Sequence, residues 1–270
     1  MKLLKISILI FLSLFFLLTA CSTVPITGRR HLELIPDASM LSMSTEQYDA
    51  FLKSHKINAD TNQTGLVRRV GRKIQKAVEQ YMAENNLSHE LKYYEWEFNL
   101  VESKDVNAWA MPGGKVVVYT GILPVAQDEK GLAVIMGHEI AHVVANHGNE
   151  RMSQGLIVQF GGMALSTALA NKPQQTRELW MQVYGAGAQY GVMLPYSRLH
   201  ESEADHLGLI FMAMAGYHPN TAVDLWKRMA KMKGDQAPPE FLSTHPSDER
   251  RIQNIRNLIP KAMLYYHSSD

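Results

Sequence analysis

The spacing of hydrophobic residues predicts two helices in the first third of the chain. Apolar side chains recur every three or four residues over 39–51 and again over 65–82. In the second segment, Val67, Val70 and Ile74 fall on one helical face. We interpret both apolar faces as packing surfaces against a core.

A small sheet is predicted next along the chain. Trp96, Phe98 and Leu100 alternate with polar neighbours, which is typical of a half-buried strand. A polar corner and a Pro-Gly-Gly turn follow over 107–114, and a second strand is predicted over 115–120. Because the second strand leads directly into an apolar helix, the sheet should lie beside that helix.

The apolar helix, predicted over 131–150, contains three ionisable side chains. His138, Glu139 and His142 interrupt a run of aliphatic residues that covers nearly the whole helix surface. Such a helix should be central in the fold, and a charge buried there needs a partner. The pattern H-E-x-x-H puts both histidines on one face, because an α-helix has about 3.6 residues per turn.

This histidine pair predicts a metal site. Two imidazoles at this spacing can bind zinc at about 2.0–2.1 Å, with Glu139 placed to act on a water rather than to bind the ion. The alternative is a core helix with two hydrogen-bonded histidines, and the apolar surroundings favour the metal. A catalytic zinc ion of this kind needs a third protein ligand. The longer motif H-E-x-x-H-x-x-G-x-x-H is absent, because Ala145 and Gly148 occupy its later positions.

The third ligand is predicted in the segment HESEAD, residues 200–205. Glu201 and Asp205 are four residues apart and therefore share one helical face. One carboxylate can bind the metal while the other supports the first helix. Without the histidine pair, an acidic run of this kind would be read as solvated surface.

Two segments between these motifs, 155–170 and 184–194, are rich in Gly, Ala and Met. They predict either close-packed helices, in which small residues permit near approach, or a mobile lid or a surface in contact with lipid. We favour close packing, with which a lid role is compatible. Neither segment reaches the roughly 18–20 continuous apolar residues of a membrane span. Helices are also predicted over 196–219 and 220–232, the second capped near Asn220.

The first residues are typical of a secretory signal, with two lysines, an apolar run over 6–18 and small residues before Cys21. The sequence LTAC, residues 18–21, resembles the bacterial lipobox, in which cleavage before the cysteine precedes its lipid modification. We therefore predict a signal peptide over 1–20 and a lipidated tether over 21–37. Cys21 is the only cysteine, so a disulfide within the chain is excluded.

Composition and charge limit the classes of partner. The chain is 46% hydrophobic, and the roughly 250 residues after the predicted signal can bury the core of a single domain, predicted over 38–260 with a tail over 261–270. The signal contains two lysines and no acid, which leaves 25 basic and 26 acidic residues. This near neutrality argues against nucleic acid and against electrostatic membrane binding, so the lipid would be the membrane anchor.

Four motifs in order, NAWAMPGG, GHEIAHVVANH, SRLHESEADHLG and STHPSDERRI, resemble a family of gluzincin zinc metallopeptidases. The family includes HtpX, the CAAX-prenyl proteases and the Oma-type mitochondrial proteases, and the likeness is greatest to its bacterial lipoprotein branch, with BepA and LoiP. It covers about 23–258. The resemblance implies an α+β, mostly helical fold with a central H-E-x-x-H helix and a small sheet edge beside the active site.

The resemblance also implies roles for individual residues. One zinc ion per chain would be bound by His138, His142 and Glu201, with Glu139 as the catalytic base and Asp205 supporting a ligand. The lipoprotein branch, together with Ser22 after the cysteine, implies a bacterial envelope protein anchored by lipid in the outer membrane and facing the periplasm.

Two further predictions concern the water position and the substrate. The histidine matching His245 can occupy the water position on zinc in some lipoprotein relatives; the alternative is a loop histidine that stabilises the folded tail. An extended substrate is expected along the strand over 115–120, with Asn107, Ala108 and Ala110 binding near the cleaved bond. Strand addition reads the backbone more than the side chains, which suits unfolded substrates.

The sequence therefore predicts a zinc endopeptidase that degrades unfolded or misassembled envelope proteins. The alternative is a chaperone or assembly lipoprotein that holds outer-membrane proteins and contacts their assembly machinery, with little proteolysis. Glu139 favours catalysis, because a structural zinc site needs no carboxylate beside its first histidine. An amidase acting on peptidoglycan peptides suits the same compartment but has no supporting motif.

Overall fold

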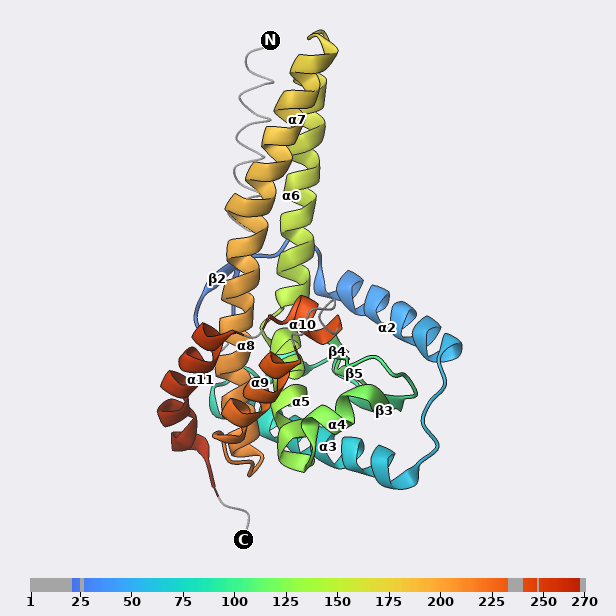
Figure 1. Ribbon diagram of the computed structural model, residues 1–270, viewed down its shortest axis with the longest axis vertical. Helices are drawn as coiled ribbons and strands as arrows, with labels where there is room; N and C mark the ends of the chain where they lie inside the picture. Colours follow the sequence, from blue (N-terminus) through green and yellow to red (C-terminus); the bar gives the residue numbers. More distant parts are fainter. Residues whose placement is uncertain (1–20, 25–26, 233–239, 247, 268–270) are drawn as a thin grey trace. The chain divides into compact units, whose positions relative to one another are not determined.

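Figure 1 shows the computed structural model of the chain, which describes residues 21–24, 27–232, 240–246 and 248–267. The signal peptide predicted over 1–20 lies outside the described residues. Backbone contacts divide the chain into two compact units. Unit 1 comprises Met1–Met40 and Asn146–Ser197, and unit 2 comprises Leu41–Ala145 and Arg198–Asp270. The single domain predicted over 38–260 stays a prediction.

Unit 2 contains a three-stranded sheet formed by β3 (Glu97–Val101), β4 (Ala108–Met111) and β5 (Lys115–Tyr119). The strand order is β3-β5-β4, with β5 parallel to β3 and antiparallel to β4. The two predicted strands are confirmed as β3 and β5. The third strand, β4, was missed, because its segment was interpreted as a polar corner.

The turn between β4 and β5 explains the Pro-Gly-Gly sequence. Gly113 and Gly114 have φ values of 87° and 80°, a backbone conformation that favours glycine. An added Cβ on Gly114 would also lie 2.7 Å from the Trp96 side chain. The tight turn therefore aligns β4 against β5 in a fixed register, with Ala110 opposite Val116.

Helices surround this sheet, and the predicted helices over 39–51 and 65–82 are confirmed as the first two of them. The unit boundaries fall inside α2 and α8. The helices that lie wholly or mostly in unit 2 are α2 (Asp37–Ser54), α3 (Thr61–Glu84), α4 (Leu123–Ala126), α5 (Glu129–Val144), α8 (Leu194–Met214), α9 (Thr221–Lys231), α10 (Glu240–Thr244) and α11 (Glu249–Ala262). Short 3-10 turns lie at Ser88–Leu91, Thr120–Ile122 and Met263–Tyr265.

The helix α5 forms the centre of unit 2, as its apolar sequence predicted. It begins after Asp128, whose side chain accepts a hydrogen bond from the amide of Gly131 at 2.8 Å. Leu132, Ile135 and Ile140 are each at most 1% exposed, and the helix contacts α3, β4 and α9. Because aliphatic residues cover every side of α5, burial on all faces fixes its position.

The helices α5 and α8 cross at a pair of glycines. A Cβ added to Gly137 would lie 3.1 Å from the carbonyl oxygen of Gly208. One added to Gly208 would lie 3.0 Å from the amide nitrogen of His138. The two backbones are therefore in direct contact one residue from the first histidine of the motif.

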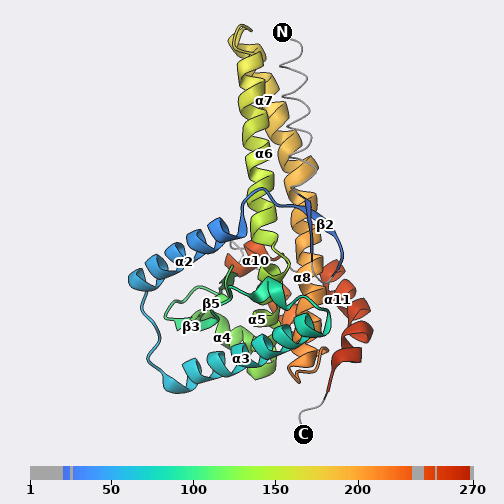
Figure 2. The same cartoon turned by 180° about the vertical axis from the view of Figure 1, so that it is seen from behind.

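Unit 1 contains a short antiparallel pair, β1 (Cys21–Thr23) and β2 (Arg30–Leu32), and two long helices. These are α6 (His147–Ala168) and α7 (Gln174–Ala188), which lie side by side as a hairpin (Figure 2). A π-helical turn, η3 (Gln189–Met193), joins α7 to α8. No described helix is both long and apolar enough to cross a membrane.

Close contacts join the two helices of the unit 1 hairpin. Tyr184 of α7 donates a hydrogen bond to the carbonyl of Val158 on α6 at 2.7 Å, and its ring lies against Gly161 and Gly162. Small residues therefore do permit near approach, as in the packing interpretation. Large apolar side chains nevertheless remain exposed on both helices, including Phe160 at 60%.

Candidate metal centre

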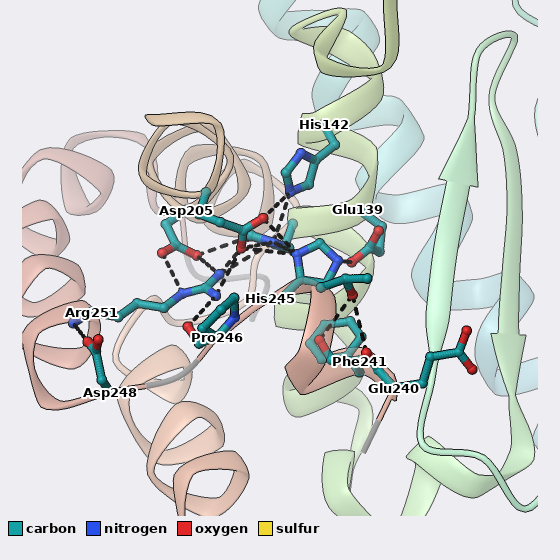
Figure 3. A network of polar contacts seen from close by, with 12 residues as sticks. Glu139, His142, Asp205, Glu240, Phe241, His245, Pro246, Asp248 and Arg251 are labelled. Atoms are coloured by element: carbon teal, nitrogen blue, oxygen red, sulfur yellow. Dashed lines mark hydrogen bonds and ion pairs between the residues drawn. The ribbon is translucent and has the colours of Figure 1, made fainter. Parts of the chain in front are cut away.

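Four ionisable side chains from three elements converge in unit 2. His138 and His142 lie on α5, Glu201 lies on α8, and His245 directly follows α10. Each can offer one ligand atom to a common point, and these atoms all lie within 4.8 Å of one another. Figure 3 shows His142 and His245 pointing toward the same place beside Glu139.

The spacing of these atoms can be compared with a tetrahedral zinc site. Ligands about 2.0–2.1 Å from zinc are separated by about 3.3 Å along each tetrahedron edge. The Nε2 atom of His138 lies 3.1 Å from Nε2 of His142 and 3.1 Å from Nδ1 of His245. The Glu201 carboxylate oxygens lie 2.9 to 3.4 Å from the three histidine nitrogens. The donor set and its spacing therefore fit one tetrahedral ion.

Glu139 lies next to this group without being part of it. Its side chain is buried, and within the described residues its Oε1 atom has no hydrogen-bond partner. Nε2 of His245 lies 3.4 Å from this oxygen. A buried carboxylate oxygen without a donor is costly unless it accepts a proton or a hydrogen bond from a further molecule. Glu139 is thus placed to act on a water or substrate.

Asp205 supports His138 on the side opposite the ligand group, and Arg251 holds Asp205 in place. Asp205 Oδ1 lies 3.1 Å from Nδ1 of His138, so the carboxylate orients that ring from behind. Arg251 of α11 donates to both oxygens of Asp205, through Nε at 2.9 Å and Nη2 at 2.8 Å. Its Nη1 lies 2.9 Å from Glu201 Oε2. Arg251 therefore links Glu201 and Asp205 of α8 (Figure 3).

Arg251 was missed by the sequence analysis, although the motif STHPSDERRI contains it. Arg251 is 7% exposed. Its guanidinium group stacks on the Trp226 ring, with 3.5 Å between the guanidinium carbon and the ring centroid. Asp248 is the N-cap residue of α11, and its side chain accepts a hydrogen bond from the Arg251 amide. The only signal was a basic residue in the first turn of a helix, which is otherwise an unfavourable place for a cation.

Burial and hydrogen bonds between neighbouring side chains shift the pKa values at the metal centre. Burial lowers the pKa of His138, but Asp205 and Glu201 outweigh it and raise that pKa to about 9. Burial lowers the pKa of His142. Burial raises the pKa of Glu139. The pKa of Glu201 is lowered, because hydrogen bonds from the histidines outweigh its burial.

The residues predicted to bind substrate lie on and beside β4. Ala108 and Ala110 belong to this strand, and Asn107 precedes it. β4 is an edge strand and contacts α5. The expectation that substrate adds to the strand over 115–120 is wrong, because β5 is the central strand and already pairs on both sides. The backbone of Cys21, the predicted lipidation site, begins β1.

Comparison with known proteins yields one family and several relatives. Residues 69–259 match the model of Peptidase family M48. The mitochondrial metalloendopeptidase OMA1 of Schizosaccharomyces pombe is 36% identical over 176 residues, covering 65% of this chain and 50% of that protein. Human OMA1 is 31% identical over 254 residues, covering 92% and 48%. The beta-barrel assembly-enhancing protease of Escherichia coli is 30% identical over 166 residues, covering 60% and 34%. The chain spans about half the length of the OMA1 proteins.

Proposed function

The chain belongs to Peptidase family M48, and we propose that it is a zinc-dependent endopeptidase that cleaves unfolded or misassembled proteins of the bacterial cell envelope. The observation that carries this proposal is the group of His138, His142 and Glu201 around one point. Beside it lies the Glu139 oxygen that has no hydrogen-bond partner within the described residues. Two imidazole nitrogens and one carboxylate oxygen are a donor set that suits zinc.

In this proposal, Glu139 is the base and later the acid of the reaction. Bound zinc would supply a Lewis acid that lowers the pKa of water from 15.7 toward about 7. Glu139 would accept a proton from the attacking water and return it to the leaving amine. Its burial raises its carboxyl pKa, which brings the group closer to the pH at which it must both accept and donate a proton.

The edge strand β4 offers a binding surface for an extended peptide. The amide of Tyr119 donates to the Asn107 carbonyl at 3.1 Å, so the Asn107 backbone faces β5. Backbone direction alternates along an antiparallel strand, and Ala108 and Ala110 therefore face away from β5. The Ala108 amide donates to the Asn107 side chain at 2.9 Å. Within the described residues, the Ala110 amide and both carbonyls have no hydrogen-bond partner, so they can pair with a substrate strand.

His245 would hold the site in a latent state. Its Nδ1 atom lies 3.1 Å from His138 Nε2 and 2.9 Å from Glu201 Oε1, where a fourth ligand of zinc would lie. A histidine in that position excludes the water that the reaction needs. The segment around His245 is attached to the loop before β4 by the amide of Phe241, which donates to the Val106 carbonyl next to Asn107. Substrate binding along β4 could therefore release His245.

We further propose that the chain is a lipoprotein anchored through Cys21 in the outer membrane, facing the periplasm. The signal and lipobox patterns support this location, and so does the name of the Escherichia coli relative, a beta-barrel assembly-enhancing protease. That name also supports the second candidate function, in which the chain assists outer-membrane protein assembly and seldom cleaves.

The test is degradation of casein by the purified chain with one equivalent of zinc or with a chelator. Cleavage should require metal, and Glu139→Gln should reduce kcat/KM by about 10²- to 10⁴-fold while metal content stays unchanged. Glu240→Gln is the matched control, because Glu240 is exposed at the start of α10 and should leave the rate unchanged. Cleavage that survives in Glu139→Gln would refute the assignment.

A second variant separates a latent protease from a protein that only holds its clients. His245→Ala should increase casein cleavage, because it opens the fourth position. Stoichiometric zinc with no cleavage in either the parent or His245→Ala would exclude the protease and favour the assembly function. Unchanged activity and unchanged zinc coordination in His245→Ala would exclude latency through this residue.

A further inference from the structure

Unit 1 contains a cavity of about 600 Å³ that plays no part in the metal centre. It lies between β2, α6, α7 and η3, and this volume is within the usual range of small-molecule sites. Most of its wall is aliphatic or aromatic. The residues that line it include Leu32, Ile157, Val158 and Gly187.

Two polar side chains of the cavity wall, Glu150 and Gln154, already have hydrogen-bond partners. Glu150 is 1% exposed and receives two hydrogen bonds from Arg29, at 2.9 and 2.6 Å. Gln154, also in the cavity wall, donates to Glu150 at 3.3 Å. A ligand in this cavity therefore need not supply a donor or acceptor to these groups. The wall also contains Arg30 and His31, and Nε2 of His31 lies 3.7 Å from the Glu33 carboxylate. The rest of the wall is aliphatic, aromatic or glycine, which favours an apolar occupant.

The surface around the cavity is also apolar. Residues 155–169 and 179–197 contain no Asp, Glu, Lys or Arg. Within these segments Ile157 is 45% exposed, Val183 54% and Tyr190 72%. Exposed apolar surface of this extent on one helical hairpin indicates a site of contact with lipid or with another apolar surface. The hairpin thus presents the cavity within a surface compatible with lipid.

The predicted lipid attachment site is next to this cavity. The backbone of Cys21 pairs directly with that of Leu32 across the β1–β2 ladder, and Leu32 is part of the cavity wall. β2 in turn is attached to α6, because the Leu34 amide donates to Ser153 Oγ at 2.9 Å and the Asn149 side chain donates to the Ile35 carbonyl at 2.7 Å. Position 21 is therefore held near the cavity by ordered structure.

We propose that the unit 1 cavity binds a long-chain fatty acyl group. An acyl chain is apolar, narrow and flexible enough to fill a cavity of this kind, and it requires no polar contact within it. The acyl group has two sources, the lipid on Cys21 of the same chain or a phospholipid of the bilayer. The first source rests on the proposed lipidation, whereas the cavity chemistry is the same for both.

The test uses the full chain in bacterial cells fed a photoreactive fatty acid, followed by irradiation and mass spectrometry of the purified protein. Adducts should form on the α6 peptide that contains Ile157 and Val158. An adduct that joins this peptide to the Cys21 peptide identifies the chain's own lipid as the source, and an adduct with a phospholipid identifies the bilayer. Both results support the proposal.

Two glycines of α7 provide matched variants. Gly187 lines the cavity and Gly185 does not, and a Cβ added at either meets no atom within 4 Å. Leucine at each position also favours the helix over glycine. Because one methylene in an apolar pocket changes affinity by about 10- to 200-fold, Gly187→Leu should reduce adducts on the α6 peptide at least tenfold. Gly185→Leu should leave them unchanged.

Three results would overturn the proposal. These are adducts that avoid the α6 peptide, equal adduct yields in Gly187→Leu and the parent, or an equal loss in both leucine variants. Both variants should retain the parent's casein cleavage rate. If the proposed peptidase function is wrong, the parent and both leucine variants will all fail to cleave casein. The pattern of adducts would not change in that case.

Discussion

Replacing Gly208 by alanine would separate two helices exactly where the metal centre depends on their contact. The added Cβ would lie 3.0 Å from the carbonyl carbon of Gly137 and 3.0 Å from the amide nitrogen of His138. Favourable contacts between carbon atoms are about 3.5–4.0 Å long. The new methyl group meets only rigid helix backbone, so α5 and α8 must move apart by about 0.5–1 Å.

The expected effect on stability is small, and the effect on metal binding is larger. Overpacking by one methyl group costs about 1–3 kcal/mol, and the helix preference of alanine over glycine returns about 1 kcal/mol. The free energy of unfolding should therefore fall by about 0–2 kcal/mol. Glu201 and Asp205 move with α8 while His138 stays on α5. Ligand distances in metal sites vary by only about 0.2 Å, so we expect zinc affinity to fall about 10- to 100-fold.

Two measurements separate these effects. Zinc affinity is measured by competition with a chromophoric chelator, and stability by urea unfolding in the presence of excess chelator. Gly155→Ala is the control, because Gly155 also lies in a helix but an added Cβ meets no atom within 4 Å. It should gain up to about 1 kcal/mol and bind zinc as the parent does. A Gly208→Ala chain with the parent's zinc affinity would refute the reasoning.

Three further predictions concern the same unit. Arg251→Lys keeps the charge but loses the two-point contact with Asp205, so zinc affinity measured by the same competition should fall about tenfold, with folding retained. Glu129 has a lowered pKa, because hydrogen bonds from Tyr217 and Lys73 outweigh its burial. Its stabilisation is present above about pH 4.5 and is lost as pH falls through the lowered pKa, so urea unfolding of Glu129→Gln should show a weaker loss of stability in acid than the parent. With free zinc at about 100 times Kd, the unfolding free energy should be about 2.7 kcal/mol higher than after zinc is removed by a chelator. Added magnesium should not restore this stability.

Local pattern accounts for the elements that the sequence predicted well. The apolar residues around α5 require burial on every side, and the four-residue spacing of His138 and His142 follows from helix geometry alone. β4 escaped detection because it has only four residues and ends at Met111, directly before Pro112. A strand this short is defined by its pairing with β5, because its own residues show no alternation of apolar and polar side chains that would predict a strand.

Long-range contacts account for what the sequence could not supply. Arg251 reaches Asp205 across 46 positions, and no local pattern specifies that meeting. Asn220 does occupy the N-cap position of α9, but its side chain makes no capping hydrogen bond, because its backbone is already helical there. The ligand roles of His138, His142 and Glu201 and the gating by His245 stay predictions, although the fold brings all four side chains together.

The order of the ligands along the chain has a consequence for how this unit can vary. All four members of the metal-binding group belong to unit 2, yet Asn146–Ser197 of unit 1 separates His142 from Glu201 in the sequence. An ion bound by both would act as a crosslink that closes a long loop. The entropy of closing such a loop changes by only about 0.6 kcal/mol for each doubling of its length. The helical hairpin can therefore be lengthened or shortened with little change in the free energy of metal binding. Its length can thus vary to match the surface that the hairpin contacts.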